Sequence, residues 1–88
     1  MDAKESVKEW LTSLISGIVS YPDDVRLEVK SDEMGVLYTL FCNQEDSGKV
    51  IGKKGETATA VRKLLTATGM GKGIRASLKI AVPDYRSP

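Results

Sequence analysis

The chain has 88 residues, which suits a single domain that can bury a core and fold alone. Its 41% apolar and 28% charged residues are typical of a soluble globular protein. One cysteine, Cys42, and no histidine exclude an internal disulfide and a Cys/His zinc site, and favour a reducing compartment such as the cytoplasm. The first residues, MDAKESVKEW, lack a signal-peptide pattern, and no run approaches the roughly 18 apolar residues of a membrane span.

The first predicted element is an amphipathic helix over residues 3–19, which Pro22 prevents from continuing. A strand follows at 25–30, where apolar and charged residues alternate, and then a turn at 31–35. Residues 36–42, VLYTLFC, are the richest run of β-forming residues and are predicted to form the central strand. Within it, Cys42 is interpreted as a small buried apolar side chain.

The second half begins with a short helix predicted over 43–51, with Asn43 as its N-cap. After the stretch Gly52-Lys53-Lys54-Gly55, apolar residues return to helical spacing over about 56–68. These residues are Ala58, Val61, Leu64 and Leu65, and Thr68 continues the same spacing.

Three glycines, Gly69, Gly71 and Gly73, are predicted to end that helix in a loop. Alternation over 74–82 then predicts a third strand. The polar residues 83–88 are expected to form a loose tail after a single domain that spans 1–82.

The predicted element order is α-β-β-α-α-β, an α+β fold. The first two strands would form a hairpin, and the helical connection makes the second and third strands parallel, with a right-handed crossover. We therefore expect a three-stranded mixed sheet with all three helices on one face. This order excludes the α-β-β-β-α fold of double-stranded-RNA-binding domains.

The net charge of +1 hides an asymmetry. Residues 1–46 hold four Lys/Arg and ten Asp/Glu, whereas residues 47–88 hold nine Lys/Arg and two Asp/Glu. Two interpretations are open: the fold mixes the halves into a neutral surface, or the second half builds a cationic face centred on the glycine stretch.

The glycine stretch has the chemistry of an anion site. Glycine tolerates positive φ and has no Cβ, so a phosphate can approach the backbone closely. Gly55 and the next residues present free N–H groups at the start of a helix, and Lys53 and Lys54 add positive charge. The pattern G-x-x-x-x-G-K-[ST] is absent, which argues against nucleotide hydrolysis. The alternative is a sharp turn between helices with solvated lysines.

The segment VIGKKGETATAVRKLL, residues 50–65, resembles the V-I-G-x-x-G signature of the KH domain. In that family the GXXG loop clamps about four nucleotides of single-stranded nucleic acid. The element order resembles the type II KH fold. The match runs from the first helix through Val82, and the chain is similar to small bacterial single-KH proteins of the KhpA type, including PDDV at 22–25 and EDSGKVIGKKG at 45–55.

The resemblance implies RNA-binding roles for particular residues. Gly52 and Gly55 would form the clamp, and Lys53 and Lys54 would face phosphates. Many KH domains carry a larger aliphatic residue where this chain has Ala58, which implies a shallower groove. The full set implied for RNA binding is Ile51, Gly52, Lys53, Lys54, Gly55 and Ala58, with Lys49, Arg62 and Lys72 as flanking cations.

Three function classes compete. The first is a non-enzymatic binder of single-stranded RNA, which the resemblance implies to be a post-transcriptional regulator or RNA chaperone in the bacterial cytoplasm. The second is a protein-interaction adaptor that dimerises with itself or with a second KH-domain protein of the Jag type. An interface would then use Ala60, Val61 and Leu64, unless the second apolar side of that helix packs on the first helix instead. The third, a small enzyme, lacks any catalytic constellation; we expect no cofactor and no metal.

Overall fold

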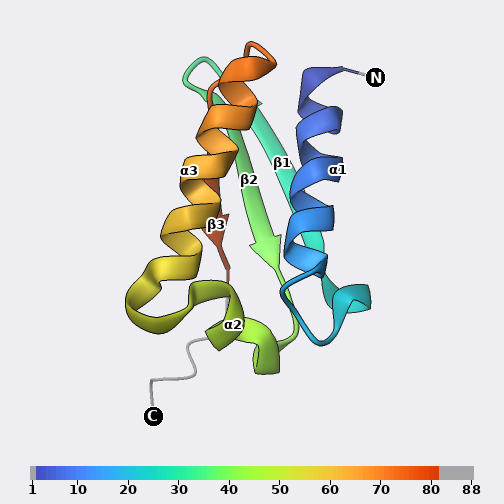
Figure 1. Cartoon of the computed structure of the whole chain (residues 1–88). Coiled ribbons are helices and arrows are strands. Elements are labelled where there is room, and N and C mark those ends of the chain that lie inside the picture. The colour runs from blue at the N-terminus through green and yellow to red at the C-terminus, as the bar shows by residue number, and fades with distance from the viewer. Residues whose placement is uncertain (1, 82–88) are drawn as a thin grey trace.

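The structure, a computed structural model, describes residues 2–81. Its helices and strands follow the order α-β-β-α-α-β, as predicted (Figure 1). The bounds are α1 Ala3–Ser16, β1 Arg26–Asp32, β2 Gly35–Phe41, α2 Ser47–Ile51, α3 Glu56–Gly71 and β3 Ala76–Ile80, with the short 3-10 turns η1 Pro22–Asp24, η2 Gln44–Asp46 and η3 Lys53–Gly55. The predicted tail, 83–88, and Val82 lie outside the described residues.

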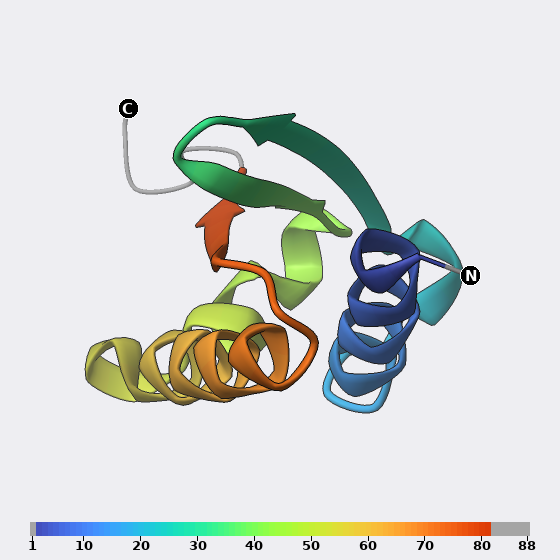
Figure 2. The ribbon, with the colours of Figure 1, turned by 90° about the horizontal axis from the view of Figure 1, so that it is seen from above.

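The sheet has the strand order β1-β2-β3, so the predicted central strand is confirmed. β1 and β2 form an antiparallel hairpin that pairs Val29 with Tyr38, and β3 runs parallel to β2, with Leu78 beside Tyr38. The helices lie on one face of this sheet, where α1 and α3 run side by side (Figure 2). The mixed sheet with helices on one face is confirmed.

The core fills the space between the sheet and the helices. Side chains on β2 alternate, so Val36, Tyr38 and Leu40 are buried under the helices while their neighbours lie on the open face. α1 contributes Val7, Leu11 and Ile15, and α3 contributes Val61 and Leu65. Each such side chain stabilises the fold by roughly 1.5–3 kcal/mol through burial. The Tyr38 hydroxyl, also buried, donates to the Lys4 carbonyl at 2.8 Å.

Two predicted helix bounds differ from the structure. α1 ends at Ser16 with Gly17 as its C-cap, and Ile18 and Val19 pack against the core beyond the end of the helix. The predicted helix 43–51 is divided into η2 and α2, with Asn43 accepting a bond from the Glu45 N–H at 2.8 Å, as an N-cap does.

The C-terminal end of α3 corrects the prediction for Gly69. This residue lies inside the helix and is buried, and a Cβ built on it would lie 3.0 Å from both the Ala76 Cβ and the Ile74 carbonyl oxygen. Gly69 therefore permits α3 to pack closely on the start of β3. The chain leaves the helix later, through Gly73, whose φ of +80° suits glycine. β3 is correspondingly shorter than predicted.

Candidate nucleic-acid interface

The loop Gly52–Gly55 joins α2 to α3 through a backbone that is left-handed at most of its residues. φ is +79° at Gly52, +57° at Lys54 and +76° at Gly55. Lys54 is the one non-glycine residue with positive φ in the described part of the chain, a conformation that costs roughly 1–2 kcal/mol. Lys53 and Lys54 are both exposed on this turn. Strained backbone at an exposed cationic loop points to a functional constraint.

The two glycines meet different surroundings. A Cβ on Gly52 would lie 2.3 Å from Thr57 Oγ1 and 2.8 Å from the Thr57 amide nitrogen, so the loop folds directly onto the first turn of α3. A Cβ on Gly55 would meet nothing within 4 Å. Gly55 precedes α3 without a side-chain cap, so the positive end of a 16-residue helix dipole faces the loop.

Three hollows run in sequence along the exposed side of α3. The first is lined by Lys54, Glu56, Thr59, Ala60 and Lys63; the second by Thr59, Arg62, Lys63 and Thr66; the third by Thr66, Met70, Gly73, Ile74, Arg75 and Ala76. Each shares lining residues with the next, so they form one path from the loop to the start of β3. We call this path the α3 channel.

The open edge of β3 lies beside the α3 channel. Val36 N–H donates to the Arg75 carbonyl and Ala81 N–H to the Leu40 carbonyl, which places the pairing groups of β3 on residues 75, 77, 79 and 81. The peptide groups of Ala76, Leu78 and Ile80 therefore point outward. Arg62 Nε donates to one of them, the Leu78 carbonyl, at 3.4 Å. Arg62 thus bridges α3 and the strand edge.

The α3 channel is cationic. Lys54, Arg62, Lys63 and Arg75 line it, and Glu56 is the one acid among the described residues that do so. Part of the positive charge of the second half therefore lies along this path, which favours the cationic face over the mixed surface. Potentials of one sign concentrated in a hollow raise the local concentration of an oppositely charged ligand.

The structure places the remaining candidate residues as follows. Ile51 is half-buried at the end of α2, and Ala58 is buried on the inner side of α3. Lys72 is the exposed residue that directly follows α3, between Met70 and Gly73 of the third hollow. Lys49 lies apart from the α3 channel, because its Nζ contacts Ser20 Oγ and lies 3.8 Å from the Asp46 carboxylate.

Of the residues predicted to form a dimer interface, one lies in the core and two lie on the surface. Val61 is 3% exposed and belongs to the core, whereas Ala60 is exposed and Leu64 is 51% exposed. The second apolar side of α3 therefore does not pack on α1. Ala60, Leu64 and Ala67 follow i, i+4, i+7 spacing on one side, and the channel residues Thr59, Arg62, Lys63 and Thr66 follow i, i+3, i+4, i+7 spacing on a neighbouring side. The two sides meet at Ala60, which also lines the first hollow.

Sequence reasoning missed several residues of this region. Thr59, Lys63 and Thr66 line the α3 channel and could have been found from their helical spacing with Arg62. It also missed the role of Asp46, whose carboxylate is buried. Its partners, Ser20 and Tyr21, lie 26 and 25 residues earlier, so the sequence around Asp46 does not identify them.

The described residues give little evidence for a catalytic site. In 2–81, no group of three His, Cys, Asp or Glu side chains could hold a metal ion. Burial, followed by the negative charge of Asp46, raises the pKa of the Cys42 thiol above its ordinary value of 9.0. Cys42 is therefore held as a thiol, the less nucleophilic form. None of the described helices is long and apolar enough to cross a membrane.

Comparison with known proteins identifies the family. The KhpA/KhpB KH domain family matches residues 8–80. The chain is 44% identical over 68 residues to a protein of Leifsonia xyli named RNA-binding protein KhpA, covering 77% of this chain and 90% of that one. Proteins of the same name from Mycobacterium leprae (43% over 65 residues; 74% and 80% covered) and Chlamydia pneumoniae (35% over 74 residues; 84% and 95% covered) are also similar. The α-β-β-α-α-β fold, the GXXG loop and these matches together place the chain in the KhpA/KhpB family of KH domains.

Proposed function

We propose that this protein binds single-stranded RNA through the Gly52–Gly55 loop and the α3 channel, and that it acts without catalysis. The observation that carries the proposal is the continuity of the two: the exposed Lys53 and Lys54 stand at the head of a path that is lined by cations along the length of α3. The relatives named RNA-binding proteins support RNA as the polyanion.

The positions of the loop, the channel cations and the β3 edge give each a different role in binding RNA. Lys53 and Lys54 attract a phosphate, and the positive end of α3 and the bare Gly55 backbone let it approach closely. Arg62, Lys63 and Arg75 then continue the positive charge toward β3. The backbone of the RNA would follow these cations, and its bases would turn toward the strand edge, where the outward peptide groups of Ala76 and Ile80 offer hydrogen bonds.

A single strand fits this arrangement better than a duplex. Base edges reach the peptide groups of β3 only when they are not already paired, and proteins read RNA sequence mostly from unpaired bases. Among the described residues, no Phe, Tyr or Trp lines the α3 channel, so no aromatic platform is available for stacking. Base contacts would be van der Waals contacts and edge hydrogen bonds, which implies modest affinity from one domain.

The exposed side of α3 supports a second proposal. Leu64 is half exposed beside Ala60 and Ala67, a small apolar surface without a partner within the described chain. We infer that this surface pairs with a second copy or with another KH-domain protein of the Jag type. The protein would then act in the bacterial cytoplasm as a post-transcriptional regulator or RNA chaperone, with RNA binding and dimerisation on neighbouring sides of α3 that meet at Ala60. An adaptor without RNA binding is the alternative.

The RNA proposal is tested by changing Lys53 and Lys54 together to Asp. Asp tolerates the left-handed conformation that Lys54 adopts, so the change replaces attraction by repulsion with little backbone strain. Affinity for a pool of single-stranded RNA oligonucleotides is measured across a salt series. Contacts to two or three phosphates predict a log–log slope of roughly −1.5 to −2 in the wild type, most of which the variant loses.

The matched control changes Lys4 and Lys30 to Asp, which alters the net charge equally but lies on α1 and β1. This control is expected to bind almost as the wild type does. Wild-type protein that binds no single-stranded RNA at low salt would refute the proposal and favour the adaptor. Equal weakening in both double variants would show that affinity follows net charge and not the loop.

A further inference from the structure

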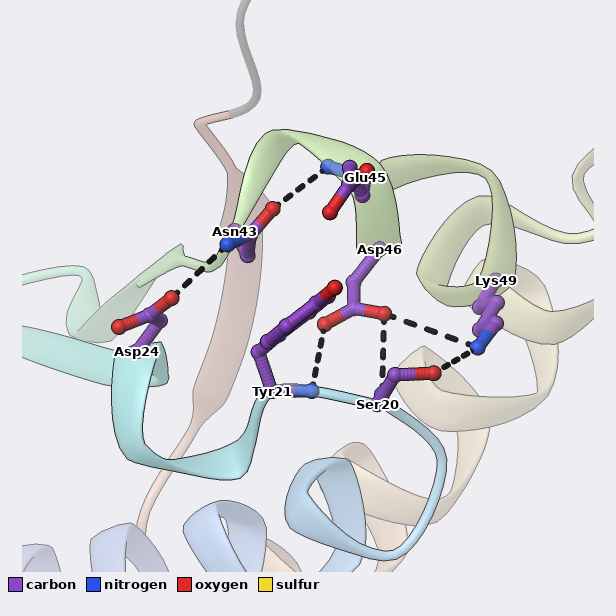
Figure 3. Close-up of polar contacts among 7 residues, drawn as sticks. All are labelled: Ser20, Tyr21, Asp24, Asn43, Glu45, Asp46 and Lys49. Carbon is purple, nitrogen blue, oxygen red and sulfur yellow. Dashed lines mark hydrogen bonds and ion pairs between the residues drawn. The ribbon is translucent and has the colours of Figure 1, made fainter.

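The Asp46 carboxylate joins two segments that are distant in the sequence (Figure 3). Its Oδ1 accepts the Ser20 N–H at 2.9 Å and its Oδ2 accepts the Tyr21 N–H at 3.0 Å. Both donors belong to the connection between α1 and η1, whereas Asp46 is the last residue of η2. Asp46 is 0% exposed, so its carboxylate makes these bonds on the protein side, where hydrogen bonds to a charged acceptor are strong.

Lys49 completes this arrangement from one turn further on. Its Nζ lies 3.8 Å from Asp46 Oδ1 and contacts Ser20 Oγ, as Figure 3 shows. The buried negative charge is therefore met by two backbone donors and one ammonium group. A buried carboxylate with this many partners is expensive to displace, because moving it leaves donors unpaired. Asp46 thus fixes the start of α2 against the α1–η1 connection.

α2 transmits this position to the Gly52–Gly55 loop. The helix has five residues, Ser47–Ile51, and such a short helix is not stable alone, so its ends and its packing determine where it lies. Ser47 and Val50 are each 1% exposed, which holds its inner side in the protein. Gly52, whose N–H donates to the Gly48 carbonyl at 2.7 Å, follows directly and opens the loop.

We propose that Asp46 is a positioning residue for RNA binding, which fixes the place and orientation of the Gly52–Gly55 loop through α2. The inference rests on the proposed RNA-binding function of that loop. Asp46 itself touches no RNA, since its carboxylate is buried.

Simple electrostatics predicts the opposite effect, which makes the inference testable. Removing a negative charge near a site for a polyanion raises the attraction between protein and RNA. If Asp46 acted only through its charge, Asp46→Asn would therefore bind RNA more tightly. If Asp46 positions the loop, the same variant binds more weakly, because an amide NH₂ would face the N–H of Ser20 or Tyr21 and the start of α2 would shift.

The experiment compares Asp46→Asn with Glu45→Gln. Both remove one negative charge at adjacent positions, but Glu45 is exposed. Affinity for a pool of single-stranded RNA oligonucleotides is measured well below the unfolding midpoint of each variant, with circular dichroism confirming the fold. Asp46→Asn is expected to bind at least about fivefold more weakly, as for typical coupling between sites, whereas Glu45→Gln binds as tightly as the wild type or slightly more tightly.

Hydrogen exchange of the Gly52, Lys53 and Lys54 amides in the free protein supplies a readout that does not depend on RNA. Faster exchange there in Asp46→Asn than in Glu45→Gln supports the positioning role even if the wild type binds no RNA, a result that would refute the RNA proposal alone. A folded Asp46→Asn variant with wild-type affinity and wild-type loop exchange would overturn the inference.

If Asp46→Asn does not fold, Asp46→Glu is used to test the positioning role of Asp46. It keeps the charge and both oxygens but moves them by one methylene in a fully buried position. Weaker RNA binding and faster loop exchange support positioning, because the charge is unchanged. Wild-type values of both would overturn it.

Discussion

Thr57 occupies the space that a side chain at Gly52 would need: a Cβ there would fall 2.3 Å from Thr57 Oγ1 and 2.7 Å from Thr57 Cβ. Gly52 also has φ +79° and ψ 171°, a region that is almost restricted to glycine. The first glycine of the loop is therefore required by the fold of the free protein, before any ligand is considered.

The two glycines should consequently respond differently to alanine. We expect Gly52→Ala to lower the free energy of unfolding by about 2–4 kcal/mol, from overpacking and backbone strain together. Gly55→Ala, with open space around it, should lower it by about 1 kcal/mol through its left-handed φ alone. Urea denaturation followed by circular dichroism measures both, and equal losses would contradict this division.

A buried hydroxyl on α2 predicts a stabilising substitution. Ser47 Oγ is buried and has no hydrogen-bond partner among the described residues. Ser47→Ala should therefore raise the free energy of unfolding by about 1 kcal/mol, because it removes an unsatisfied group and adds a better helix former. Ser20→Ala, which removes a hydroxyl that contacts Lys49, is the control and should not stabilise. A midpoint of urea unfolding that falls in Ser47→Ala would show that the hydroxyl has a partner.

Stability should decline at alkaline pH because the buried Tyr38 and the partly buried Cys42 resist ionisation. Burial, with smaller contributions from Glu5 and Asp2, raises the pKa of Tyr38 above 10.0, and burial raises the pKa of Cys42 above 9.0. The folded state holds these protons more tightly than the unfolded state does. The contribution of Cys42 is therefore complete below pH 9.0 and that of Tyr38 below pH 10.0, and each is lost as the pH rises through the higher pKa of the folded state.

Tyr38→Phe isolates the tyrosine part of this decline. The variant lacks the bond to the Lys4 carbonyl, so near neutral pH its free energy of unfolding should be lower by about 1 kcal/mol. The difference from the wild type should shrink above pH 10, where only the wild type loses stability at this position. Urea titrations at several pH values measure it, and a constant difference from pH 7 to 11 would count against the argument.

The exposed side of α3 predicts the effect of a charge at Leu64. Leu64→Glu should leave the fold intact, because this helix position is 51% exposed, and should convert a dimer into a monomer. Sedimentation velocity gives the oligomeric state. Met34→Glu, an equivalent change at a 73% exposed position of the β1–β2 turn, should remain dimeric. A wild type that stays monomeric at high concentration would exclude the homodimer and leave pairing with another KH protein to be tested.

The sequence allowed the sheet to be predicted because apolar density is a local property. Residues 36–42 are apolar on both faces, as a middle strand requires, and the connection of β2 to β3 by helices fixed their parallel direction. The GXXG loop could also be predicted from the sequence, because its residues are contiguous.

Features that depend on residues distant in the sequence could not be predicted from local patterns. Gly69 looked like a helix end, yet it is a close-packing position whose neighbours, Ile74 and Ala76, are visible only once α3 lies against β3. Val61 and Leu64 both suit an apolar stripe, and only the position of the sheet decides that the first is buried and the second exposed. Asp46 looked like an ordinary acid near a helix start for the same reason.

The arrangement of the two sides of α3 has a consequence for how a dimer would engage RNA. Pairing through Leu64 would leave the part of the channel beyond Ala60, with Arg62 and Arg75, open on each subunit. One RNA strand long enough to span both sites would then be held by two weak contacts at high effective concentration. Such avidity can strengthen binding by roughly 10²–10⁴ without any new contact, provided that the strand reaches both sites. Short transcripts would escape while long unpaired tracts would be retained, so the dimer would select its RNA by length as well as by sequence.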